Sequence, residues 1–177
     1  MMKAAEPPHA AATTRSTTRR EPVAPFATWP VQHLEPSVGF YWYIEPATLI
    51  CQSYAEHGTL EVIDRHNDVV DRILARHRKA IEAAGGLFMI FDWRSVQGYN
   101  QDARARQRER MQAREKTYAR RTVVVIHPAN RLLRMAVGAA NLFATLFFRS
   151  SIEILTDPTS VVAEAKLAPP PRNQPFI

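Results

Sequence analysis

The most informative polar side chains in the sequence follow the apolar run Leu87–Phe91. They are Asp92, Trp93, Arg94, Ser95, Tyr99, Asn100 and Asp102. Asp92 ends the apolar run, and Asp102 stands where a helix is expected to begin. The N-terminus of a helix exposes unpaired N–H groups and favours anions. The segment therefore predicts a loop that docks a partner through polar anchors. The alternative is structural: Asp102 caps the helix, and Asp92 forms a hydrogen bond with the loop.

A second candidate site is the arginine-rich segment 101–120, which is predicted to be helical. Between residues 104 and 121, seven arginines and one lysine stand against two glutamates, so this segment carries +6, as does the whole chain. Arg106, Arg110 and Arg114 share one row at helical spacing, where each like-charged pair costs about 0.2–0.5 kcal/mol. An anionic partner, nucleic acid or acidic lipid, would relieve that cost. The alternative is a solvated helix face, and no basic–aromatic pattern of a nucleic-acid-binding motif is present.

Signals for catalysis and metal binding are weak. His127 follows a predicted strand and could act as a general base, but no Ser or Cys nucleophile stands at a recognisable spacing from it. His66 and His77 are 11 residues apart, so no helical i, i+4 pair supports a metal site. Cys51 is the only cysteine, which excludes an intrachain disulfide and a cysteine metal cluster. We therefore expect no enzyme, no cofactor and no metal site.

Alternating strand and helix patterns must position these residues. Strands are predicted at 40–44, 48–54, 87–91 and 122–127, and helices from Thr59 to about residue 84, over 101–120 and over 132–148. Asn100 or Asp102 is expected to cap the second helix, and Asn130 the third. A last short strand, 152–155, precedes a short helix from Asp157-Pro158 to about Lys166. The expected fold is α/β in the order ββαβαβα, with a mixed, mostly parallel sheet and helices packed on it.

The composition predicts one domain with two tails. Of the 177 residues, 46% are apolar and 23% charged, which is ordinary for a globular protein. Residues 1–36 are rich in Pro and Thr and lack apolar periodicity, so we expect a disordered tail. Phe26, Trp29 and Val31 are expected to pin its end to the domain. The domain is expected to span 37–167, followed by a flexible Pro-rich tail, 168–177.

The helix 132–148 contains the longest apolar run, Met135–Phe148. At 14 residues this run is shorter than the roughly 20 of a membrane-spanning helix, so burial is expected. The helix also carries Phe143, Phe147 and Phe148, which is more apolar surface than one domain is expected to bury. Any part of this surface left exposed would indicate a homodimer or a membrane-surface contact. Because no export signal opens the chain and it has one cysteine, we expect a cytoplasmic protein.

Four features together resemble the STAS/SpoIIAA-like family of small domains, which are named for sulfate transporters and anti-sigma-factor antagonists. They are the element order, the Gly85-Gly86–strand–Asp92 junction, the loop 93–100 and the helix entry 132–137. The resemblance covers about residues 38–167. Classical members have a strand-ending Asp and then a loop ending in Asp-Ser-Ser-Gly, whose second Ser is phosphorylated by a partner kinase. Asp92 matches the strand-ending Asp. Asn100-Gln-Asp-Ala103 stands in place of Asp-Ser-Ser-Gly, so Asp102 occupies the position of the phosphorylated Ser.

The resemblance implies a non-enzymatic regulatory domain that docks a protein through the loop and helix start after the third strand. Because Asp102 occupies the position of the phosphorylated Ser, we expect no phosphorylation switch at the helix start. Ser95 is a further candidate phosphosite, with a merely solvated loop serine as the alternative. The alternative function is anion binding by the helix 101–120, with nucleic acid or an acidic membrane surface as the partner.

Overall fold

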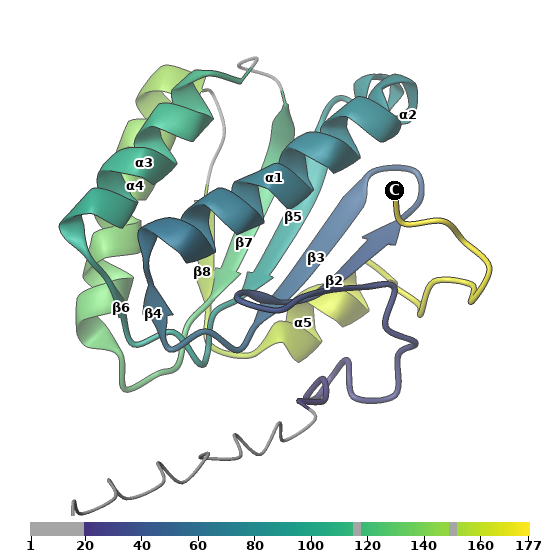
Figure 1. Cartoon of the computed structure of the whole chain (residues 1–177), viewed down its shortest axis with the longest axis horizontal. Coiled ribbons are helices and arrows are strands. Elements are labelled where there is room, and N and C mark those ends of the chain that lie inside the picture. The colour runs from purple at the N-terminus through teal and green to yellow at the C-terminus, as the bar shows by residue number, and fades with distance from the viewer. Residues whose placement is uncertain (1–19, 115–117, 149–151) are drawn as a thin grey trace, which may run out of the picture.

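A six-stranded sheet forms the centre of the chain, with helices on both of its faces (Figure 1). The computed structural model describes residues 20–114, 118–148 and 152–177, with the backbone alone for residue 140 and residues 142–148. The strands follow the order β1-β2-β3-β5-β7-β8 across the sheet. Their bounds are His33–Glu35 (β1), Gly39–Ile44 (β2), Thr48–Ser53 (β3), Leu87–Asp92 (β5), Ala119–Val125 (β7) and Ile152–Leu155 (β8).

One face of the sheet is covered by the helices that connect its parallel strands. The helices of the described chain are α1 (Leu60–Arg76), α2 (Arg78–Ala83), α3 (Gln101–Gln112), α4 (Arg131–Phe148) and α5 (Pro158–Glu164). β1, β2 and β3 are antiparallel neighbours, whereas β3, β5, β7 and β8 are parallel. Each parallel crossover advances in the same direction, which places α1, α3 and α4 on one face (Figure 1). Ile73 of α1 and Leu133 of α4 accordingly share one buried cluster.

The opposite face is covered by α5 and by the segment that precedes β1. The Phe26 ring centroid lies 5.1 Å from that of Trp29 and 5.2 Å from that of Trp42 on β2. Val161 of α5 belongs to the same buried cluster. Because both faces are covered, every residue of β5 is buried, as the continuous apolar run predicts for a central strand.

Both expected tails differ from the structure where it describes them. Phe26 is fully buried and Trp29 is 8% exposed, as expected for residues that pin the segment, but Val31 is 46% exposed. At the other end, Phe176 is 7% exposed and stacks on His33 with 4.8 Å between ring centroids. Residues 20–36 and 168–177 therefore belong to the packed domain, because a few aromatic anchors bury area without periodicity. Residues 1–19 lie outside the described part.

Local signals in the sequence locate most elements correctly. The Thr59 hydroxyl caps α1 by accepting from the N–H of Val62, and the Asp157 carboxylate caps α5 by accepting from Thr159. The first predicted helix is interrupted at His77, where α1 ends and α2 follows. β7 begins at Ala119, so residues 119 and 120 of the predicted helix 101–120 are strand instead.

The predicted α/β class and mixed sheet are confirmed, and three short strands were not predicted. β1 adds an edge to the sheet, while β4 (His57–Gly58) and β6 (Gly98–Tyr99) pair with each other in parallel. A Cβ on Gly58 would collide with the Tyr99 ring, so this close pairing requires glycine. The β4–β6 pair joins the start of α1 to the loop that enters α3. Apart from β1, β4 and β6, the chain follows the expected order ββαβαβα, and the expected last strand and short helix come after it.

Candidate functional site

Asp92 lies at the carboxyl end of β5 with only 2% of its surface exposed. Arg94 binds it with two charge-assisted bonds, from Nε to Oδ1 at 2.8 Å and from Nη2 to Oδ2 at 2.7 Å. Gln52, its register partner on β3, donates from Nε2 to Oδ2 at 2.9 Å. A buried carboxylate needs such partners to offset its desolvation. Asp92 therefore has a structural role in this arrangement and does not face solvent as a docking anchor.

The same polar cluster, Gln52–Asp92–Arg94, holds the N-terminal segment. The Gln52 side chain accepts from the N–H of Val23 at 2.7 Å and donates to its carbonyl at 3.0 Å. Arg94 Nη2 donates to the carbonyl of Ala24 at 2.6 Å. Gln52 was missed at the sequence level. The available signal was an amide near the end of an apolar strand, beside the strand that ends in Asp92.

The remaining loop residues divide between internal bonds and the surface. Ser95 Oγ donates to the carbonyl of Ser53 at 2.6 Å, so this hydroxyl ties the loop to β3. Asn100 caps α3, with its Oδ1 accepting from the N–H of Ala103 at 2.8 Å. Between the two predicted caps, the structure selects Asn100. Asp102 lies exposed in the first turn, where its charge complements the helix N-terminus.

Trp93 and Tyr99 pack together beneath this loop. The Trp93 ring centroid lies 5.7 Å from that of Phe91 and 5.3 Å from that of Tyr99. Both rings line a cavity of about 10 Å³, which is room for a single water molecule. Burial raises the pKa of the Tyr99 hydroxyl well above its ordinary value. These two aromatic side chains therefore pack against the core under the loop.

His66 lines the same cavity and is held by Tyr41. The Tyr41 hydroxyl and His66 Nδ1 are 2.9 Å apart. Burial, together with the positive charge of Arg114, lowers the pKa of His66 to about 3. His66 is therefore neutral near pH 7. His127, the candidate base, is exposed after β7, and its Nδ1 accepts from the N–H of Ala129 at 3.3 Å. His127 therefore forms a hydrogen bond with the turn after β7, whereas Asp92 is bound by Gln52 and Arg94.

Asn130 connects the loop to α4. Its Nδ2 donates to the carbonyls of Val96 and Gln97 at 2.9 and 3.0 Å. Its Oδ1 accepts from the N–H of Leu133 at 3.0 Å, which confirms the predicted cap. The starts of α3 and α4 therefore both lie beyond the carboxyl ends of the parallel strands, and the loop after β5 connects them.

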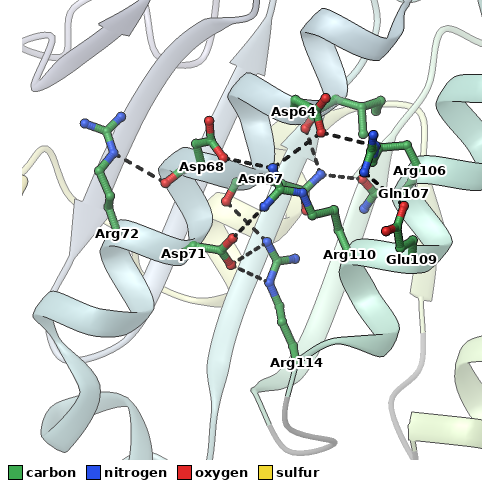
Figure 2. A network of polar contacts seen from close by, with 11 residues as sticks. Asp64, Asn67, Asp68, Asp71, Arg72, Arg106, Gln107, Glu109, Arg110 and Arg114 are labelled. Carbon is green, nitrogen blue, oxygen red and sulfur yellow. Dashed lines mark hydrogen bonds and ion pairs between the residues drawn. The ribbon is translucent and has the colours of Figure 1, made fainter.

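The row of Arg106 and Arg110 on α3, continued by Arg114 just beyond the helix end, faces an acidic row on α1, as Figure 2 shows. Arg110 Nη2 lies 3.0 Å from Asp68 Oδ1, and Arg114 Nε lies 2.8 Å from Asp71 Oδ1. Arg106 Nε lies 3.5 Å from Asp64 Oδ1. The sequence carried a signal for this that was missed. Asp64, Asp68 and Asp71 share one row of a predicted helix, at i, i+4 and i+7.

The three arginines differ in burial. The exposed fraction of the side chain falls from 40% at Arg106 to 32% at Arg110 and 9% at Arg114. Arg114 also donates to the carbonyl of Asn67 at 3.3 Å and lies 5.4 Å from the centroid of the Tyr118 ring. The like-charged row thus has its anionic partners within the chain. The observation that motivated nucleic-acid or acidic-lipid binding by this row is therefore explained internally.

Helix α4 buries one side and exposes large apolar residues on the other. Leu133 and Val137 are 4% and 7% exposed and face the core, whereas Leu132 and Met135 are 80% and 71% exposed. The expectation of burial is thus met on one side only. The side chains of Phe143, Phe147 and Phe148, on which the predicted homodimer partly rested, lie outside the described part of the chain.

In residues 20–114, 118–148 and 152–177, no group of three or more His, Cys, Asp or Glu side chains is arranged to hold a metal ion. None of the helices described combines the length and hydropathy that a membrane crossing needs. No family model, curated protein or solved structure matches the chain.

Proposed function

We propose that the chain is a non-enzymatic, cytoplasmic STAS-like domain that regulates by docking a protein partner. The docking surface is formed by the loop after β5 and by the starts of α3 and α4. The observation that carries this proposal is the exposure of Leu132 and Met135, at 80% and 71%, beside that loop. Large apolar side chains at a rim of polar residues are typical anchors of a protein interface.

The internal bonding of the loop supports docking over chemistry. Asp92 is paired with Arg94, and His66 is buried and neutral beside Tyr41. A general acid or base must reach a substrate atom within hydrogen-bond distance, and neither group faces solvent. The bonds of Arg94, Ser95 and Asn130 instead hold the loop in one shape, which lowers the entropy cost of binding a partner.

The exposed members of the loop region complete the surface. Gln97, Asn100, Gln101 and Asp102 are exposed around the start of α3. Under the proposed alignment with the STAS family, Asp102 gives this position a constant negative charge. Partner binding would then not depend on phosphorylation of the helix start. Ser95 is engaged with β3 through its hydroxyl, so it is a poor substitute for the family's phosphoserine.

Site-specific photo-crosslinking in the native host tests this proposal. A photoreactive residue at position 101 or 132 is expected to give a discrete adduct with one protein. The matched control is position 34, because Leu34 is 47% exposed on β1, at the opposite edge of the sheet. Equal adducts from position 34, or none from positions 101 and 132, would contradict a docking surface here.

A further inference from the structure

The outward face of α4 combines an apolar stripe with a basic border. Successive residues of a helix are rotated by about 100°, and Leu133 and Val137 mark the side that faces the sheet. Met135 then points away from the core. Leu132 and Ala139 lie on one side of it and Arg131 and Arg134 on the other, and all five are exposed.

The two arginines are unfavourable for the isolated domain. α4 has no Asp or Glu along its 18 residues, and its first turn is basic. Cations near a helix N-terminus oppose the helix dipole. Arg131 and Arg134 have no ion-pair partner among the residues that the structure describes. An acidic partner would supply the compensation that α1 supplies to Arg106, Arg110 and Arg114.

Charge also discriminates between the occupants that this stripe could have. Residues 1–19 contain Lys3, Arg15 and Arg19 against Glu6 alone, so this segment is basic and does not complement α4. A second copy related by a two-fold axis would present the same basic border to this one. A protein with acidic residues beside an apolar stripe complements both parts of the surface.

We propose that the occupant is an acidic amphipathic helix of a protein partner. Its apolar residues pack on Leu132 and Met135, while its carboxylates pair with Arg131 and Arg134. Leu132, Met135 and Ala139 stand at i, i+3 and i+7, the spacing at which a helix presents a ridge to a neighbouring helix. Ala139 and Ala136 are small and exposed, so a second backbone can approach closely. This proposal rests on the docking function and specifies its partner.

Display selection of helical peptides against the full chain tests this assignment. The probe is a library of amphipathic helices with randomised flanking charges. We expect enrichment of Asp and Glu beside an apolar i, i+3 or i, i+4 pair. A selected peptide should bind Arg131→Glu with Arg134→Glu about tenfold more weakly, and Leu132→Ser with Met135→Ser at least as weakly. Binding should also weaken as salt rises.

Matched variants make the outcome specific. Arg65→Glu with Lys79→Glu changes the net charge equally at exposed sites of α1 and α2, and it should leave binding unchanged. Val31→Ser with Leu34→Ser removes exposed apolar residues at the opposite edge and should also have no effect. Enrichment of neutral or basic peptides, or equal losses in these controls, would overturn the proposal. So would a dimer in sedimentation that Leu132→Ser with Met135→Ser dissociates.

The two proposals fail in different ways. A crosslinked partner whose attached segment is not an acidic helix overturns the helix assignment and leaves the docking function intact. Absence of any adduct from positions 101 and 132 removes the docking function itself. Selection of acidic helices by the purified chain, with loss in the α4 variants alone, supports the assignment independently of the host.

Discussion

Arg114 donates from Nε to Oδ1 of Asp71 at 2.8 Å, and only 9% of the arginine side chain is exposed. This contact joins α1 to the residue that follows the C-cap of α3, across 43 residues of sequence. Of the twelve residues of α3, all of them described, Ala103 alone is buried. Apolar burial therefore contributes little to the position of α3, and ion pairs with α1 hold it in place. Individual exposed ion pairs contribute about 0–1 kcal/mol each, so the buried Arg114 is expected to dominate.

Replacing Arg114 should test that dominance directly. We expect Arg114→Ala to lower the free energy of unfolding by about 1–3 kcal/mol, because it removes charged hydrogen bonds and the packed stem of the side chain. Urea denaturation measures the change. Arg108→Ala is the control, since Arg108 lies within α3 and is exposed, and it should stay within about 0.5 kcal/mol. Equal losses in both variants would contradict the assigned role of the Arg114–Asp71 pair.

The attachment of α3 should also depend on salt. Screening weakens partly exposed ion pairs, with a Debye length of about 3 Å at 1 M salt. Amide hydrogen exchange in α3 should therefore be faster in 1 M NaCl than in 0.05 M NaCl, where the Debye length is roughly 14 Å. α1 is the internal control, because Ile63, Val70 and Ile73 are buried. Salt-independent exchange in α3 would mean that something other than charge holds it.

The arginines of α3 that pair with α1 and the exposed arginines Arg104 and Arg108 should respond differently to charge reversal. Arg106→Glu with Arg110→Glu places new carboxylates against Asp64 and Asp68, so we expect a loss of about 1–2 kcal/mol. Arg104→Glu with Arg108→Glu alters exposed residues and should cost within about 0.5 kcal/mol each. Urea denaturation compares the two double variants. Equal stability of the two would show that the facing acidic row does not matter.

The second pair of arginines also provides a clean test of anion binding. Under the proposed function, the wild type should show no salt-sensitive binding to duplex DNA or anionic vesicles near physiological salt. Fluorescence anisotropy and vesicle sedimentation measure this. Salt-sensitive binding that Arg104→Glu with Arg108→Glu abolishes would support the anion-binding function instead, without the confounding loss of stability.

Loss of the Asp92 carboxylate should destabilise the domain and release the N-terminal segment. Asp92→Asn leaves Arg94 without its anionic partner in a largely buried site, and we expect a loss of about 2–4 kcal/mol. Exchange at the amide of Val23 should become faster, because Asp92 helps to hold Gln52. Glu82→Gln is the control, since the Arg78–Glu82 pair is exposed on both sides. A change at Asp92 as small as at Glu82 would refute this structural role.

His66 should make the domain less stable in mild acid. Its pKa is lowered to about 3 in the fold, by burial and by Arg114, whereas the unfolded chain takes up the proton near pH 6.5. The contribution of His66 to the free energy of unfolding is thus fully present above about pH 6.5 and is lost as pH falls toward 3. Between pH 7 and 5 the loss from His66 is about 2 kcal/mol, at 1.36 kcal/mol per pH unit below 6.5. Urea denaturation at both pH values measures it.

Comparison of variants assigns that pH dependence to His66. His66→Gln should reduce the difference between pH 7 and pH 5, whatever its effect at pH 7 alone. The lowered pKa of His33, due first to burial and then to Arg72, adds a smaller contribution of the same sign. The exposed His127 provides the control variant His127→Gln. If His66→Gln retains the full pH dependence of the wild type, the acid sensitivity originates elsewhere.

Patterns within short stretches of sequence predict most of the elements that surround the candidate site. The apolar run before Asp92 identifies β5, and Thr59, Asn130 and Asp157 mark three helix starts through their capping side chains. These signals are local, because a strand alternates or stays apolar over a few residues and a cap bonds within its own turn. For this reason the α/β class can be predicted without tertiary information.

The roles of the site residues depend on contacts that no local pattern contains. Helical spacing shows that Arg106, Arg110 and Arg114 share a row, but only the packing of α3 on α1 brings the acidic row to them. Likewise Asp92 meets Gln52 through the pairing of β3 with β5, 40 residues apart. Partners at such separation are selected by how the elements pack. Tertiary structure therefore decided which charges are neutralised inside the fold, and left Leu132 and Met135 exposed beside the loop.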